Sequence, residues 1–314
     1  DVKKEKEIKK KERITQKSLF IFPQKKPAIY GASTKEIEKS SILNQKDFTR
    51  AKETINFIKD KKWNSALKSA SKVKDREFRN LINWMYLKTT RNGASFSEYK
   101  NFIEQNSEYP RINRIRFLAE GKIYLRNNSP TSIINWFDKY PPLGGMGKIK
   151  LAEAYLEKGQ TEKVQELIKE GWETATISKN DLGYYRAKFK KFIDSEDHIR
   201  RADYLAWEKK YWDLKRMLKY LPKDQRALYN ARQILMSNSY GVDNAISKVP
   251  EYLKKDPGLE FDRLRWRNRR GRLEGSLEIL YRNSIKTEQQ MVRPDKWWEQ
   301  RENVVRSLIY KKRY

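Results

Sequence analysis

The feature that most constrains this chain is a repeated pair of amphipathic segments joined by a short polar turn. Between residues 151 and 172, Leu151, Ala154 and Tyr155 precede Gly159, and Val164, Leu167 and Ile168 follow it. Apolar residues at steps of three and four form one face of a helix, so this stretch predicts a helical hairpin. The plan recurs at 54–73, 116–140, 202–222 and 264–281. With only 13 Gly and 10 Pro, the sequence predicts an all-α fold.

A single hairpin cannot bury its own apolar face, and stacking hairpins side by side gives an α-solenoid, or superhelix. The hairpins are unevenly spaced and share no consensus. We therefore predict degenerate hairpins that are tetratricopeptide-like in plan only. We expect the α-superhelical domain to span residues 45–314, with a seam between two lobes at residues 141–147, where Pro and Gly cluster.

Residues 1–44 depart from this pattern. Residues 1–17 are a run of mixed charge with almost nothing to bury, and a polar stretch with Pro27 and Gly31 lies further on. A segment that cannot bury apolar surface does not compensate the entropy lost on folding. We expect a charged, largely disordered segment and linker ahead of the helical domain.

The charge of the chain is strongly positive. Lys and Arg number 70 against 41 Asp and Glu, a net charge of +29. An excess of this size attracts polyanions such as nucleic acid, anionic lipid or an anionic glycan, without selecting among them. Interspersed Lys and Glu also solubilise helix surfaces, so part of the excess has no binding role.

Several kinds of chemistry find no support in the residues. The chain has no Cys, and His198 is its only His, so neither a thiolate site nor a His-based metal site is indicated. The motif at 144–147, Gly-Gly-Met-Gly, lacks the Gly-Lys-Ser/Thr ending of a phosphate-binding loop. No apolar run approaches the roughly 18 to 20 residues that span a bilayer. We assign no catalytic residue, no metal and no cofactor.

Basic and aromatic residues alternate in two places. Arg265, Trp266, Arg267 and Arg269 follow one another in the last third of the chain, and basic residues surround Trp207 and Trp212. Aromatic rings stack on sugars or bases, while Arg and Lys bind carboxylates or phosphates, so these six residues are candidates for binding a glycan. The alternative is that the Trp side chains pack between hairpins, which is the commoner role of Trp at helical spacing.

A second pattern lies further on, where Pro294, Trp297, Trp298, Arg301 and Arg306 are spaced for one helix. Pro suits the first turn of a helix, and Trp297 and Arg301 then share a stripe. Trp298 faces about 100° away, so we expect the two Trp to wedge the helix between two neighbours. Arg301 and Arg306 could equally be internal ion-pair partners for Glu299 and Glu302.

These residues, with Asp256-Pro257-Gly258-Leu259 before them, resemble the helical N-terminal region of the soluble lytic murein transglycosylases. In that family a D-P-G-L segment leads into an R-x-R-W helix, and a P-x-x-W-W-x-x-R-x-x-x-x-R helix follows. The ranges 205–222, 231–232 and 249–250 are similar to the preceding blocks. The resemblance runs from about residue 45 to residue 314 and is most specific after Tyr204.

The resemblance implies a function. Members of the family are periplasmic enzymes that cleave the MurNAc-GlcNAc bond of peptidoglycan without hydrolysis, leaving a 1,6-anhydro product. One Glu acts first as acid and then as base, in a lysozyme-like domain marked by Glu-Ser and Gly-Leu-Met-Gln. This chain has neither motif, so we expect a non-catalytic scaffold, truncated before the catalytic domain, that positions or binds peptidoglycan glycan strands.

The second interpretation needs no enzyme. A basic α-solenoid can act as an adaptor that binds RNA or an acidic protein partner, and the charge and the hairpins alone support this. A solenoid that reads bases has a regular repeat with variable polar residues at fixed positions, and the uneven spacing here argues against that.

Overall fold

The computed structural model describes residues 40–237, 240–284 and 291–313. Within these ranges the chain is all-helical and has no strand, which confirms the all-α prediction. The segment expected to be charged and disordered, residues 1–44, lies outside the described residues except for its last positions, 40–44.

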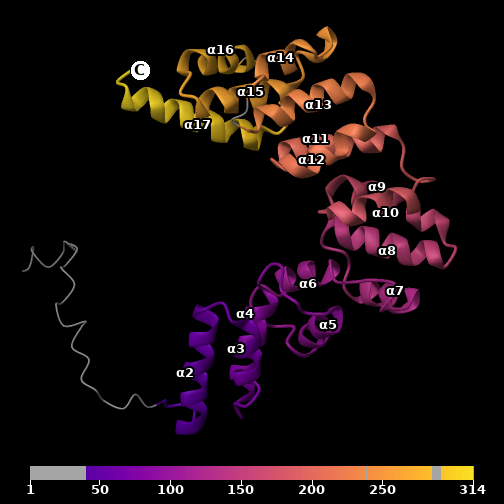
Figure 1. Cartoon of the computed structure of the whole chain (residues 1–314), viewed down its shortest axis with the longest axis vertical. Helices are drawn as coiled ribbons and strands as arrows, with labels where there is room; N and C mark the ends of the chain where they lie inside the picture. Colours follow the sequence, from indigo (N-terminus) through magenta and orange to yellow (C-terminus); the bar gives the residue numbers. More distant parts are fainter. Residues whose placement is uncertain (1–39, 238–239, 285–290, 314) are drawn as a thin grey trace, which may run out of the picture. The chain divides into compact units, whose positions relative to one another are not determined.

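The helices follow one another with short connections (Figure 1). In chain order they are α2 Gln45–Lys59, α3 Trp63–Ala70, α4 Arg76–Leu87, α5 Phe96–Gln105, α6 Ile112–Glu120, α7 Pro130–Lys139, α8 Gly145–Glu157, α9 Thr161–Thr174, α10 Lys179–Lys188, α11 Ser195–Trp207, α12 Tyr211–Met217, α13 Lys223–Leu235, α14 Val242–Ser247, α15 Pro257–Arg269, α16 Leu273–Ser284 and α17 Pro294–Tyr310. Two 3₁₀ turns, η1 Leu218–Tyr220 and η2 Glu251–Leu253, follow α12 and α14.

The chain divides into two compact units, and the boundary falls between Asn80 and Leu81. In the first unit, α2 and α3 pack against each other around small residues such as Ala51 and Ala66. Asn44 caps α2 by accepting a hydrogen bond from the Asp47 backbone N–H at 2.9 Å. The buried Asp47 carboxylate in turn accepts from the Lys74 N–H at 3.1 Å, which ties the start of α2 to the segment after α3.

In the second unit, helices adjacent in sequence pack on each other, notably α8 on α9, α11 on α12 and α15 on α16. The turn predicted at Gly159 occurs where expected, and the hairpins predicted at 202–222 and 264–281 turn at Lys209 and Gly271. Gly159 and Gly271 have left-handed φ of 72° and 66°, which Gly adopts without steric cost, and they separate α8 from α9 and α15 from α16. Lys209 joins α11 to α12 with a φ of 58°.

The expected seam at residues 141–147 lies inside the second unit. The carboxylate of Glu120, from α6, accepts hydrogen bonds from the Leu143 and Gly144 N–H groups, the latter at 3.1 Å. Gly147 has no space for a Cβ because that carboxyl group lies against it. The segment is therefore held to α6 by hydrogen bonds and close packing, and the boundary between the two compact units lies elsewhere, after Asn80.

Candidate functional site

The candidate site is built around α15, whose first residues are the D-P-G-L segment. Asp256 caps the helix by accepting from the Leu259 N–H at 2.7 Å, and Pro257 occupies the first turn. Gly258 lies against the guanidinium of Arg232, so any Cβ there would collide with it. Helix capping, helix initiation and close packing therefore explain why Asp256, Pro257 and Gly258 occupy these positions.

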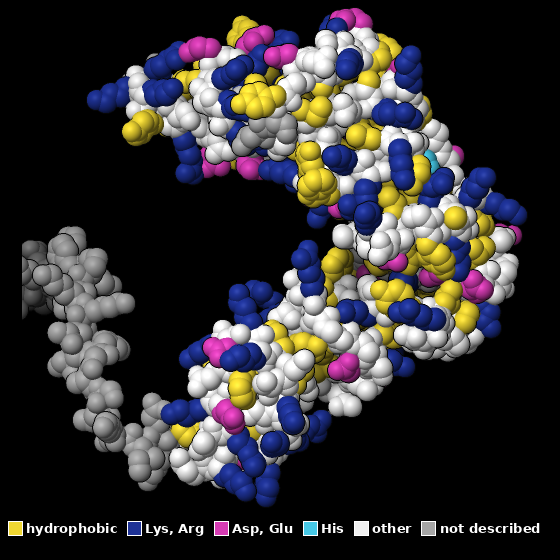
Figure 2. Space-filling model, in the orientation of Figure 1, with side chains coloured by type: hydrophobic (Ala, Val, Ile, Leu, Met, Phe, Trp, Pro, Cys, Tyr) yellow, Lys and Arg dark blue, Asp and Glu magenta, His cyan; other side chains and the backbone are white. Residues whose placement is uncertain are grey.

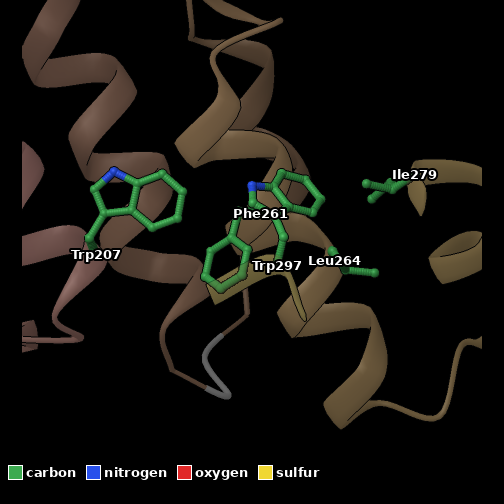
Figure 3. Close-up of a cluster of buried hydrophobic side chains, with 5 residues drawn as sticks. All are labelled: Trp207, Phe261, Leu264, Ile279 and Trp297. Carbon is green, nitrogen blue, oxygen red and sulfur yellow. The ribbon is translucent and has the colours of Figure 1, made fainter. Parts of the chain in front are cut away.

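One face of α15 is held by an aromatic core, drawn in Figure 3. The Phe261 ring lies between the rings of Trp207 and Trp297, with centroid distances of 5.0 Å and 5.5 Å. Trp207 and Trp297 are only 3% and 2% exposed. Trp207 is therefore a core residue, and the expectation that it contacts a glycan is corrected, because its ring is covered by α15.

Beside this core lies a buried charge centre. The fully buried Arg232 of α13 donates to Asp262 at 2.9 Å and to Asp203 at 2.6 Å, and Asp256 lies 4.0 Å away. The same Asp262 carboxylate lies 3.2 Å from the Arg265 guanidinium. Arg232 thus has three carboxylates near it, whereas Arg265 has a share in one.

A pocket of about 420 Å³ opens next to this centre. Its walls come from the α11–α12 turn, the end of α13, α15 and α17. It is lined by Lys209, Tyr211, Met236, Arg265, Asn268, Arg269, Glu299, Gln300 and Asn303. Three cations, three amides, one carboxylate and one phenol form most of this wall, so the pocket is basic, although apolar atoms make up most of its exposed surface.

The cations of the pocket differ in what they bind. Lys209 lies 3.9 Å from Glu299, the acid of the pocket, and Arg269 donates to the carbonyl oxygens of Leu235 and Ser237 at 2.5 Å and 3.5 Å. Arg265 is only 5% exposed, and its Nε and Nη1 atoms are buried without a hydrogen-bond partner among the described residues. Buried donors without a partner are rare, so a ligand or water is expected there.

Burial lowers the pKa of the Arg265 guanidinium, the neighbouring Asp262 carboxylate opposes this, Arg232 adds to the lowering, and Glu299 opposes it again. Burial likewise raises the pKa of Asp262, against the pull of Arg232 and Arg265. A guanidinium keeps its proton at neutral pH even when its pKa is lowered. Arg265 therefore presents a full positive charge in a place where water screens it poorly.

The other residues expected to bind a glycan lie in different environments. Arg265 and Arg269 line the pocket together. Trp212 is 65% exposed, and its ring lies 5.0 Å from that of Tyr211, which lines the pocket. Arg267 turns to α16, where it donates to the Gly275 carbonyl and to Glu278 at 3.2 Å.

Trp266 does not line the pocket. Its half-buried ring carries the guanidinium of Arg270 at 5.4 Å and that of Arg272 at 4.9 Å. Its indole nitrogen is buried without a partner among the described residues. The alternating Arg and Trp of this segment therefore point to different faces of α15 rather than to one binding surface.

The second predicted helix is α17, and Pro294 occupies its first turn. Trp297 is in the core, but Trp298 is 69% exposed, so the expectation that both Trp are wedged between neighbours is wrong for Trp298. Arg306 pairs with Glu302 at 2.5 Å, as one alternative predicted. Arg301 is half-buried, with one guanidinium nitrogen unpartnered among the described residues.

The amides of the pocket were not predicted from the sequence. Asn268 donates to the Gln300 side chain at 3.1 Å, which joins α15 to α17, and Asn303 lies one turn further along α17. Their signal was weak, because isolated Asn and Gln on a helix are ordinary surface residues. A clearer signal was present at Arg265. It lies on a helix next to the apolar Leu264 and one turn after the apolar Phe261, which indicates that its charge is close to the buried face.

Basic side chains are frequent on the face of the molecule that Figure 2 shows. Figure 2 shows Lys and Arg side chains over the visible face of both units, interspersed with Asp and Glu. Across the described ranges, no three His, Asp or Glu side chains cluster closely enough to hold a metal ion. No helix in them is long and apolar enough to cross a bilayer.

Comparisons with family models, curated proteins and solved structures give no match for this chain.

Proposed function

We propose that this chain is a glycan-binding helical scaffold of the kind that soluble lytic murein transglycosylases carry in the periplasm. The observation that carries the proposal is the pocket between α12, α15 and α17, where two nitrogens of the buried Arg265 lack a hydrogen-bond partner among the described residues, beside the amides of Asn268 and Gln300. Peptidoglycan offers hydroxyl, acetamide and carboxylate groups, which these side chains recognise. The exposed Trp212, beside Tyr211, adds a ring on which a sugar can stack.

In this proposal the helical hairpins form an α-solenoid of degenerate tetratricopeptide-like units. The enzyme as a whole cleaves the MurNAc-GlcNAc bond non-hydrolytically, with a Glu outside these 314 residues acting as acid and then base. The chain described here would hold or orient the glycan strand. Positioning of this kind raises the rate of a reaction by fixing the substrate before the chemical step.

The basic adaptor for RNA is the competing proposal, and the net charge is its main support. RNA binding of that type depends on many exposed cations and falls steeply with salt. A pocket with three cations beside Glu299 and three amides suits a small polar or acidic group better than an extended phosphate backbone. We therefore rank the glycan first.

The test is co-sedimentation of the purified chain with insoluble peptidoglycan, next to its binding of single-stranded RNA, over a range of salt. We expect peptidoglycan binding that survives physiological salt and a several-fold loss for Arg269→Gln. The matched control is Lys248→Gln, which removes the same charge from the exposed end of α14. Salt-steep RNA binding with no sedimentation would support the adaptor instead.

A further inference from the structure

We infer that the pocket takes a carboxylate, carried by an acidic sugar or by a peptide attached to the sugar, with the Arg265 guanidinium as its principal donor. The inference rests on the proposed glycan-binding function and names the group that the glycan must carry. A pocket that accepts only hydroxyl and acetamide groups would bind neutral and acidic glycans alike.

The first argument is the charge of Arg265. Its nearest carboxylate, Asp262 at 3.2 Å, already accepts from Arg232 at 2.9 Å. Two buried guanidinium groups thus share one buried carboxylate, and Arg232 has Asp203 and Asp256 in addition. Arg265 is the member of the centre that is left under-compensated, and it lines the pocket. A buried charge is stable only when it is paired, so an anion in the pocket completes the centre.

The second argument is that other cations of the pocket already have partners. Lys209 faces Glu299, and Arg269 is held by two backbone carbonyls. Backbone carbonyls carry no net charge, so a ligand meets two guanidinium groups, those of Arg265 and the exposed Arg269, beside the single carboxylate of Glu299, and the pocket attracts an anion. A planar guanidinium binds a planar carboxylate through two parallel hydrogen bonds, and the Glu299 carboxylate of the wall repels a phosphate dianion more strongly than a single negative charge.

The third argument is the surrounding amides. Asn268, Gln300 and Asn303 provide both donors and acceptors at the wall of the pocket. Such groups bind the hydroxyl and acetamide groups of a sugar, and amides contribute no net charge. The pocket thus combines one site for an anion with several for neutral polar groups, which fits an acidic saccharide.

The test measures binding of four probes to the full chain by calorimetry. Chitobiose is the neutral glycan, the GlcNAc-MurNAc disaccharide carries a sugar carboxylate, a muropeptide carries peptide carboxylates, and inorganic phosphate is the competing anion. We expect one or both acidic glycans to bind about tenfold more tightly than chitobiose. The disaccharide and the muropeptide distinguish the two sources of the carboxylate.

Three variants are measured with the same ligands. Asn303→Asp adds a negative charge at an exposed position of the pocket wall. It should weaken the binding of acidic glycans about tenfold and leave the binding of chitobiose unchanged. Asn244→Asp makes the same change at an exposed position of α14 and should alter neither. Arg265→Lys keeps the charge but loses the planar donor, and its fold is checked by circular dichroism because Arg265 is buried.

The outcomes separate the two proposals. Equal affinity for chitobiose and both acidic glycans, unchanged by Asn303→Asp, overturns the carboxylate inference and leaves glycan binding intact. A fifth probe, the free stem peptide without sugar, is measured in the same way, and its binding together with no binding of chitobiose or the disaccharide supports the carboxylate inference and overturns the glycan function. Tighter binding of inorganic phosphate than of every carboxylate overturns the inference.

Discussion

Helices α8 to α10 and helices α13 to α15 both bury charged side chains, but they compensate the charges in different ways. In the first region the ammonium of Lys150 lies over the rings of Tyr124 and Tyr185, with centroid distances of 4.1 Å and 5.4 Å. The buried Glu153 accepts from Tyr184 at 2.5 Å and pairs with Lys188 at 3.1 Å. Each charge there meets a ring or an opposite charge.

In the second region the compensation is uneven. Arg232 has three carboxylates within 4.0 Å, while Arg265 shares one of them and faces a pocket. The comparison teaches that a buried charge alone does not mark a binding site. Arg265 differs because its positive charge is only partly compensated and because it lines a pocket that a ligand can enter. The following predictions test that difference.

The largest effect is expected for Arg232→Met. Removing this guanidinium leaves Asp203, Asp256 and Asp262 with only Arg265 to balance them. Breaking a buried ion pair on one side costs about 3–5 kcal/mol, because the remaining charge is buried without a partner. Urea unfolding followed by circular dichroism measures the loss. A loss below about 1 kcal/mol would mean that the ion pairs of Arg232 contribute little to the stability of the fold.

Glu120 is a third buried charge, and its effect is expected in the pH dependence of stability. Burial raises the pKa of this carboxyl to about 7, although the Leu143 and Gly144 N–H groups oppose the rise. The folded state then binds a proton more tightly than the unfolded state, whose pKa is about 4.5. The free energy of unfolding should therefore fall as pH rises between these values, by at most about 3 kcal/mol.

The measurement is thermal unfolding from pH 4.5 to 8 for the native chain and for Glu120→Gln. Subtracting the two curves removes the contribution of His198 and other groups that titrate in this range. The variant should have a flatter profile over the same interval. If the stability of the native chain and that of Glu120→Gln changed with pH in the same way, Glu120 would be ionised in the folded state, with its charge compensated as fully as that of Arg232.

Gly258→Ala is expected to have an intermediate effect. The new methyl group would collide with the Arg232 guanidinium, which carboxylates hold in place, so either the helix or the charge centre must shift. Overpacking of this kind costs about 1–3 kcal/mol. The matched control is Gly183→Ala in α10, where nothing lies within 4 Å of the added Cβ and the change should be neutral or slightly stabilising. Equal stabilities of the two variants would contradict the close contact.

The hairpins and their turns could be predicted from the sequence because their causes are local. Gly159 and Gly271 interrupt a period that each helix carries in its own residues. The pocket could not be predicted, because Arg265, Gln300 and Lys209 meet only after three helices have packed. Trp297 and Trp298 illustrate the limit. Adjacent residues differ by about 100° around a helix, so only the neighbours decide which one is buried.

The smallest effect is expected for Lys150→Met, the counterpart of Arg232→Met in the first region. Burial lowers the pKa of the Lys150 ammonium, against the attraction of Glu153, so the charged form is disfavoured in the fold. Met has a similar length and packs well on the two Tyr rings, and replacing a buried charge by an apolar side chain is often neutral or stabilising. We expect a change of less than about 1 kcal/mol in the free energy of unfolding, measured in urea as for Arg232→Met. A loss as large as that of Arg232→Met would mean that both regions depend equally on their cations, and the contrast between ring contact and carboxylate pairing would then not explain the difference between them.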